Sequence, residues 1–209
     1  MPPFVQIVSS TNELEALIGL PSELVIKKEL GRLDDHMCEF VGRAPMVLLG
    51  TVGANGNCDV SPRGDLPCVA KVLDTQTLLV PERPGNRRAD SLRNILQTGR
   101  IGLLFLVPGV GETLRVNGRA CLTSDETLLA PLSVGGKTPI IGIGIEVEEC
   151  YFQCAKALIR SKLWSQPSPE PQSAEFNFAK VLVDQTGIRD QSVEALARQI
   201  ETSYRERLY

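Results

Sequence analysis

The sequence predicts an α+β protein that is mainly β, with about six strands in a small antiparallel barrel and helical extensions at both ends. Three observations support this class. Short apolar runs follow one another closely between residues 46 and 148, and most are joined by turn-forming residues. Only residues 86–98 interrupt these runs with a helical pattern, whereas a doubly wound sheet needs a helix after almost every strand. Helical patterns also occur before residue 45 and after residue 150.

The first 44 residues are expected to form a helical extension. Residues 10–12 (Ser-Thr-Asn) can cap a short helix that runs to Ile18. A second helix is expected to open at Pro21-Ser22-Glu23. Its apolar side would consist of Leu24, Ile26, Leu30 and Leu33.

Two hairpins are expected to open the barrel region. Residues 46–52 and 58–61 flank the Asn55-Gly56 pair, which is a strong hairpin signal. Residues 69–73 and 77–81 flank a second turn at residues 74–76. Both pairs are therefore predicted to be antiparallel.

A short helix and three further strands follow in the predicted order. In residues 86–98, Ala89, Leu92, Ile95 and Leu96 recur at helical spacing, and Gly99 ends the run. The remaining strands are predicted at residues 100–107, 112–123 and 140–148.

The C-terminal part is expected to be helical around a linker. Residues 151–164 have Ala155, Leu158, Ile159 and Leu163 on one side of a predicted helix. Residues 165–171 are rich in Pro and Ser, which is typical of a linker. Two helices are predicted over residues 176–209, separated at Gly187.

Composition excludes several classes of function. The chain has 209 residues, with 22 basic and 25 acidic side chains and a formal net charge of −3. General binding of nucleic acid or of an anionic membrane needs a broad basic surface, so neither partner is expected. The sequence has no secretory leader pattern or membrane span, and we expect a cytoplasmic protein with reduced cysteines.

The side chains available for catalysis are few. His36 is the single histidine, so neither a histidine-rich metal site nor a Ser-His-Asp triad is expected, and no metal is predicted. His36 itself is expected to pack or cap. The catalytic residues are unknown from the sequence. Any chemistry is therefore expected to belong to a bound cofactor.

The segment 81–93 is the strongest candidate for a binding site. Here a predicted strand ends, a Pro/Gly turn follows, and a helix is expected to begin at or just after Asn86 among several arginines. Unpaired N–H groups at a helix N-terminus together with guanidinium groups favour a phosphate. The alternative is a solvated helix face, with Arg93 and Asp90 in surface ion pairs.

A second polar group follows the first hairpin at residues 61–65, Ser-Pro-Arg-Gly-Asp. A hydroxyl, a guanidinium and a glycine-opened backbone at a strand end can reach one ligand. The alternative is an ordinary turn with an Arg-Asp pair.

Three stretches together resemble the FMN-binding proteins related to pyridoxamine 5'-phosphate oxidase. They are residues 60–65 (VSPRGD), residues 79–95 (LVPERPGNRRADSLRNI) and residues 109–120 (GVGETLRVNGRA). The resemblance covers roughly residues 40–164. It implies a six-stranded split β-barrel that forms a homodimer, with FMN bound in clefts at the subunit interface. It also divides the chain into an N-terminal extension (1–44), an FMN-binding split-barrel domain (45–164), and a linker with C-terminal helices (165–209) that pack on the barrel or on its partner.

The resemblance also implies a set of cofactor-binding residues. Those matching the segment expected to hold the FMN phosphate are Arg83, Asn86 and Arg87. Those expected beside the ribityl chain or phosphate are Ser61 and Arg63. The backbones of Val80 and Pro81 would pass along the isoalloxazine, while Asp90 and Ser91 would cap and brace the helix. Arg115 and Asn117 share one face of a predicted strand and would reach the flavin from the partner subunit, or else serve a cross-strand structural role.

The segment after the last strand would contribute a possible substrate or cofactor contact. Gln153 stands where many relatives have a histidine, and an amide cannot act as an acid or base near neutral pH. Lys156 and Arg160 are four residues apart and could meet an anion, or form a solvated basic face. Trp164 is expected to pack, and Cys150 with Cys154 to be buried thiols rather than a redox or metal pair.

The function favoured at this stage is an FMN-dependent oxidoreductase with an unknown small-molecule substrate or redox partner. Two alternatives stay open. One is a non-catalytic flavin-binding sensor or carrier, consistent with Gln153 and the scarcity of acid and base groups. The other is binding of a deazaflavin in the same cleft. Haem ranks last because His36 is the only available axial histidine.

Overall fold

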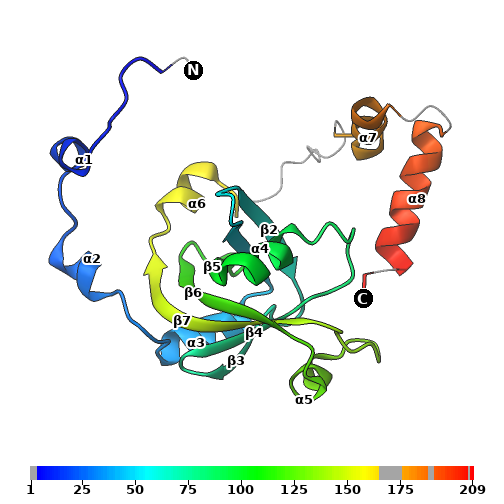
Figure 1. Cartoon of the computed structure of the whole chain (residues 1–209), viewed down its shortest axis with the longest axis horizontal. Coiled ribbons are helices and arrows are strands. Elements are labelled where there is room, and N and C mark those ends of the chain that lie inside the picture. Colours follow the sequence, from blue (N-terminus) through cyan, green and yellow to red (C-terminus); the bar gives the residue numbers. More distant parts are fainter. Residues whose placement is uncertain (1–3, 165–175, 188–190, 207) are drawn as a thin grey trace.

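The computed structural model describes residues 4–164, 176–187, 191–206 and 208–209, and its centre is one antiparallel sheet (Figure 1). The strands are β1 (Met46–Val52), β2 (Cys58–Gly64), β3 (Lys71–Asp74), β4 (Thr77–Pro81), β5 (Arg100–Leu106), β6 (Thr113–Thr123) and β7 (Gly142–Gln153). Their order across the sheet is β2-β1-β5-β6-β7-β4-β3. The expected six-stranded barrel was wrong by one strand, although each of the seven predicted strand ranges overlaps a strand of the structure. The two edge strands β2 and β3 are not paired with each other, so the structure shows an antiparallel sheet with helices but no closed ring of strands.

Both predicted hairpins are confirmed. β1 pairs with β2 from Val52↔Cys58 to Met46↔Gly64, so the loop between these strands contains Asn55 and Gly56. Gly56 has a φ of 82°, a conformation that glycine adopts without strain. β3 pairs with β4 across a two-residue turn at residues 75–76. β2 reaches Gly64, three residues farther than predicted, because Pro62 and Gly64 continue the pairing with β1.

The core lies on the inner face of this sheet. Alternate residues of β1 and β5, such as Leu49 and Phe105, are fully buried, as expected for strands with one face in the core. Two helices complete the core: α3 (Asp35–Arg43), with Met37 and Val41 buried, and α4 (Asp90–Thr98).

The predicted helix over residues 151–164 is wrong in its first part. Residues 151–153 continue β7, with Tyr151 opposite Arg115 and Gln153 opposite Thr113 on β6. Pairing with the long neighbouring strand satisfies their backbone groups, which outweighs a helical side-chain pattern at the end of a sheet. The helix that follows, α6, covers only Lys156–Ser161. Cys150 and Cys154 are therefore not one helical turn apart.

In the N-terminal extension the first predicted helix is confirmed, whereas the second is shorter than expected. α1 (Thr11–Ile18) is capped by Ser10, and α2 (Glu23–Lys27) is also short; neither has a buried residue. The second predicted helix does not continue to Leu33. Instead Leu30 forms a β-bridge with Cys150 and Leu33 enters the core, and α3 begins after the Asp34 cap.

The C-terminal helices agree with the prediction. α7 (Phe178–Thr186) ends at Gly187 and α8 (Val193–Glu206) follows. Figure 1 shows these two helices on one side of the sheet and α1 with α2 on the other. The predicted linker at residues 165–171 lies outside the described residues. A short helix α5 (Glu126–Leu129) and a 3-10 turn η1 (Ala130–Leu132) were not predicted. None of the described helices is both long and apolar enough to cross a bilayer.

Candidate phosphate site at the start of helix α4

Helix α4 begins at Asp90 rather than at Asn86. The segment before it takes an unusual course, because Arg87 and Ala89 both have left-handed backbones with φ values of 63° and 56°. The side-chain oxygen of Asn86 accepts the N–H of Arg88 at 2.9 Å and so forms a turn in place of the first helical residues. No side chain caps the N-terminus of α4. The first N–H groups of any helix lack intrahelical acceptors, and without a side-chain cap these groups favour an anion.

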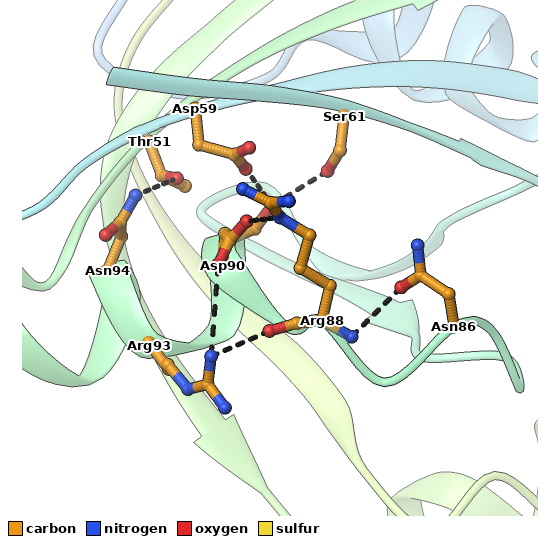
Figure 2. A network of polar contacts seen from close by, with 9 residues as sticks. Thr51, Asp59, Ser61, Asn86, Arg88, Asp90, Arg93 and Asn94 are labelled. Atoms are coloured by element: carbon orange, nitrogen blue, oxygen red, sulfur yellow. Dashed lines mark hydrogen bonds and ion pairs between the residues drawn. The ribbon is translucent and has the colours of Figure 1, made fainter. Parts of the chain in front are cut away.

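A chain of hydroxyl and charged groups lies at this helix start. The Ser91 hydroxyl donates to Asp59 and lies 2.7 Å from the Ser61 hydroxyl. Arg63 then donates through Nη1 to the Ser61 hydroxyl (2.9 Å) and through Nε to Glu82 (2.8 Å). Ser61, Arg63 and Ser91, three predicted site residues, are thus brought together from β2 and α4. We call Asp59, Ser61 and Ser91 the hydroxyl cluster; Figure 2 shows Asp59 and Ser61 of this cluster beside the loop before α4.

Two ion pairs fasten the loop after β4 to the end of β2. Arg63 pairs with Glu82, and their side chains are only 16% and 24% exposed. Arg83 pairs with Asp65 through Nε at 2.8 Å and Nη2, and also donates to the Leu132 carbonyl. The Asp65 side chain is 4% exposed, so this pair is nearly dry. The structure therefore gives Arg83 a bracing contact, whereas the sequence predicted a phosphate contact for it.

The remaining arginines of the loop differ in their hydrogen-bond and ion-pair partners. Arg88 pairs with Asp90, and Arg93 donates to the Arg88 carbonyl at 2.8 Å (Figure 2). Arg93 also lies 3.9 Å from Asp90, which is the surface pairing that was the alternative interpretation of the segment. Arg87 is exposed and makes no hydrogen bond or ion pair with the described residues. Among the arginines of this loop it is the cation with the most freedom to meet a ligand.

Val80 and Pro81 end the strand β4 and are both buried. They pair with Ile143 and Gly142 of β7 on one edge. On the other edge, β3 pairs only as far as Leu79, so the backbone beyond it has no strand partner. Pro81 has no N–H, and any donor to a ligand along this edge must come from another residue, while Pro81 offers a carbonyl.

Arg115 and Asn117 lie on the outer face of the sheet, which confirms that they share a face. Arg115 donates to the Tyr151 hydroxyl at 2.9 Å, and Asn117 donates to Glu149 at 2.8 Å. Both contacts are the cross-strand structural pairs considered above. A groove of about 420 Å³ runs beside Asn117 across the side-chain-free backbone of Gly50 and Gly102.

Gln153, Lys156 and Arg160 are brought together in a second groove, of about 610 Å³. Gln153 accepts a long hydrogen bond of 3.4 Å from Thr113. The sequence did not identify Lys28 or Tyr151 as parts of this groove. Lys28 is more than 120 residues away in the chain, and Tyr151 was assigned to a helix, so no local pattern connected them with Arg160.

The other candidate residues are not placed for catalysis. His36 is exposed on α3 and lines neither groove. Burial raises the pKa of the Cys150 thiol to about 11, so this thiol stays protonated at neutral pH. Within the described ranges no group of three or more His, Cys, Asp or Glu side chains could hold a metal. The indole of Trp164 donates to the Val110 carbonyl at 2.8 Å, in keeping with a packing role.

Comparison with known proteins identifies the central region. Residues 33–154, more than half of the chain, match the protein-family model described as pyridoxamine 5'-phosphate oxidase. A comparison with curated proteins finds no match.

Several solved structures are similar to this chain. One is HupZ of Group A Streptococcus, with 17% identity, covering 58% of this chain and 94% of HupZ, at a TM-score of 0.49. A second, described as a pyridoxamine 5'-phosphate oxidase from Lactobacillus delbrueckii, has 23% identity over 59% of this chain and 98% of its own, at 0.47. A third, an FMN-binding protein from Syntrophomonas wolfei, has 12% identity over 55% and 86% of the two chains, at 0.42. The family assignment therefore depends on the match over residues 33–154.

Proposed function

Because the chain belongs to the pyridoxamine 5'-phosphate oxidase family, we propose that it is an FMN-dependent oxidoreductase that holds the flavin phosphate at the start of α4. The observation that carries the proposal is the unpaired Arg87 beside an uncapped helix N-terminus and the hydroxyl cluster. A phosphate dianion needs several convergent donors, and backbone N–H groups, a guanidinium and hydroxyls supply them together.

The residues at this site fit a phosphate without rearrangement of the core. Arg63 uses Nε and Nη1 in the contacts with Glu82, Ser61 and the Pro62 carbonyl, and its Nη2 has no partner in the described residues. The proposal therefore gives Arg63 and Arg87 the charge contacts. It assigns Ser61 and Ser91 the hydroxyl contacts, for which the Ser91 proton turns from Asp59 to the phosphate. Arg83 keeps its bracing role, because its Nε and Nη2 donors are already directed at the nearly dry Asp65 carboxylate and at the Leu132 carbonyl.

The chain itself would bind and orient the cofactor, whose isoalloxazine supplies the redox chemistry when it is bound. The unpaired edge of β4 beyond Leu79 offers the Pro81 carbonyl to a planar heterocycle. Gln153 can donate and accept hydrogen bonds but cannot transfer a proton at neutral pH. A carrier or sensor that binds FMN without turnover is the second candidate, and it is favoured by this same residue.

The outer face of the sheet supports the proposal of a homodimer in the manner of a split barrel. Across β2, β1 and β5 this face carries apolar side chains that the single chain leaves partly uncovered. Met46 is 41% exposed and Val60 is 69% exposed, and Leu48 and Leu104 are half-buried beside them. A second copy would cover these side chains and the groove over Gly50, which gives a reason for an apolar surface here.

FMN titration of the purified protein tests the cofactor assignment. Arg87→Ala is expected to weaken FMN binding about tenfold, because one charge-assisted contact to the phosphate is lost. Arg43→Ala is the matched control, since Arg43 is an exposed arginine that pairs with Glu39 on α3. Equal FMN affinity in both variants would contradict the assignment of this site to the phosphate. A copurified compound with the mass of a deazaflavin would replace FMN as the cofactor.

Two further measurements separate the remaining alternatives. Reduction of the bound flavin by a nicotinamide donor, followed by reoxidation with an acceptor, distinguishes an oxidoreductase from a carrier that does neither. Light scattering of Val60→Glu tests the dimer. Ile140→Glu is the control, because Ile140 is 82% exposed and does not belong to β2, β1 or β5. We expect Val60→Glu to be monomeric and to lose FMN. A dimeric Val60→Glu protein with bound FMN would contradict an interface at this face.

A further inference from the structure

We propose that Tyr209 is a positioning residue of the flavin-phosphate site, which holds the loop after β4 in the conformation that presents Arg87 to the phosphate. Tyr209 follows α8 and is half-buried. It lies outside residues 33–154, the part of the chain that matches the family. The inference rests on the proposed function, because it names a residue that acts on that same site.

Tyr209 contacts both members of the ion pair that fastens this loop to the end of β2. Its hydroxyl donates to Asp65 Oδ1 at 3.2 Å. Its ring centre lies 5.5 Å from the guanidinium carbon of Arg83, which is within the range of a cation–π contact. Arg83 donates to the other carboxylate oxygen of Asp65, Oδ2. The negative charge of Asp65 raises the pKa of the Tyr209 hydroxyl, so this group stays protonated as a donor. The phenol therefore supports the ion pair without competing for the same oxygen.

A third contact joins Tyr209 to the turn that follows η1. Lys137 Nζ donates to the main-chain oxygen of Tyr209 at 2.8 Å. The Leu132 carbonyl, at the end of η1, accepts from Arg83. Tyr209 thus connects the end of β2, the loop after β4 and the turn after η1. Among the described residues, every hydrogen bond between residues 176–209 and the rest of the chain involves Tyr209.

These contacts matter for the phosphate because Arg83 and Arg87 belong to one short loop. Residues 82–89 connect β4 to α4, and residues 84–88 are exposed. Arg87 has a left-handed backbone, which a residue other than glycine keeps only where surrounding contacts impose it. A loop that is loose at Arg83 would have to be ordered when the phosphate binds, and this ordering costs affinity. A loop that Tyr209 holds at Arg83 is ordered in advance.

Titrations of the full-length protein with FMN and with riboflavin test the inference, because riboflavin is FMN without its phosphate. We expect Tyr209→Ala to weaken FMN binding about fivefold, since loop order is coupled to phosphate binding, and to leave riboflavin binding unchanged. Tyr209→Phe keeps the ring beside Arg83 and loses only the hydroxyl, so it should restore part of the FMN affinity. Tyr204→Ala is the matched control, because Tyr204 lies on α8 and is 65% exposed. Circular dichroism confirms that each variant is folded.

Fluorine NMR measures the docking of Tyr209 directly. The chain has three tyrosines, so labelling with 3-fluorotyrosine gives three resonances, and the Tyr209→Phe spectrum assigns the resonance of Tyr209. Coupling between two binding events is reciprocal, so FMN should favour docked Tyr209 by the same factor by which Tyr209 favours FMN. We expect FMN to shift the Tyr209 resonance more than riboflavin does, and neither ligand to shift the Tyr204 resonance.

Three results would overturn the inference and leave the proposed function intact. One is equal FMN affinity in Tyr209→Ala and Tyr204→Ala. Another is an equal loss of FMN and riboflavin affinity in Tyr209→Ala, which would mean that Tyr209 supports the whole fold rather than the phosphate loop. The third is a Tyr209 resonance that FMN does not change. Failure of the proposed function gives a different result: the protein of unaltered sequence would bind no FMN, and the flavin assignment and this inference would then both be wrong.

Discussion

Removal of the Asp65 carboxylate should destabilise the protein far more than removal of a surface acid. The Asp65 side chain is 4% exposed and accepts hydrogen bonds from Nε and Nη2 of Arg83, and its other oxygen accepts the Leu66 N–H at 3.1 Å. In Asp65→Ala the guanidinium of Arg83 would stay in a nearly dry position with the Leu132 carbonyl and the Tyr209 ring, but without an acid among the described residues. Loss of one partner of a buried ion pair costs about 3–5 kcal/mol. Typical domains have an unfolding free energy of about 5–15 kcal/mol, so the loss would be a large fraction of the total.

Urea unfolding at a fixed protein concentration measures this loss. At a slope of about 2 kcal/mol per molar urea, the midpoint of Asp65→Ala should fall by roughly 2 M. Glu146→Ala is the control, because its pair with Arg119 has both side chains about 60% exposed, and such pairs contribute less than about 1 kcal/mol. The double variant Asp65→Ala/Arg83→Met should regain much of the loss, since no unpaired charge is left inside. A midpoint for Asp65→Ala equal to that of Glu146→Ala would refute the reasoning.

Three further predictions concern glycine, thiol and hydroxyl positions. Gly118→Ala should lower the unfolding free energy by about 3 kcal/mol or more, because a Cβ there would lie 2.0 Å from the Glu146 carbonyl oxygen. Gly42→Ala on α3 is the control: its Cβ would meet nothing within 4 Å, so it should raise the unfolding free energy by about 0.5–1 kcal/mol. Thermal unfolding compares the two variants. The buried Cys150 thiol, whose pKa is about 11 in the folded protein, should resist a thiol reagent at pH 8 that modifies the exposed Cys58. Its contribution to stability is complete below the unfolded-state pKa of about 9 and should fall as pH rises from 9 towards 11. Ser91→Ala should lower the unfolding free energy by about 1–2 kcal/mol in urea, because it leaves Asp59 without its donor; an unchanged midpoint would mean that the hydroxyl cluster is only a surface contact.

The sheet could be predicted from the sequence wherever a local pattern determined it. The Asn55-Gly56 turn and the alternating residues of β1 and β5 specify a hairpin and a buried face without knowledge of distant partners. The end of β7 could not be predicted in this way. Residues 151–153 become a strand because β6 extends far enough to pair with them, and that pairing joins segments almost 40 residues apart. Helical spacing within residues 151–164 was real but applied only to the short α6.

The roles of the arginines show why a motif alone cannot define a binding site. The sequence places Arg83 and Arg87 in one phosphate-binding segment, and their local patterns are alike. The structure separates them by the acids that reach them: Asp65, at the end of β2, takes Arg83, while no described acid approaches Arg87. An arginine with a buried carboxylate partner stabilises the loop, and an arginine without one keeps its charge for a ligand. One motif therefore holds both the residue that braces the loop and the residue that we propose binds the phosphate. The two are distinguishable by experiment, since loss of Arg83 should lower stability first and loss of Arg87 should lower FMN affinity alone.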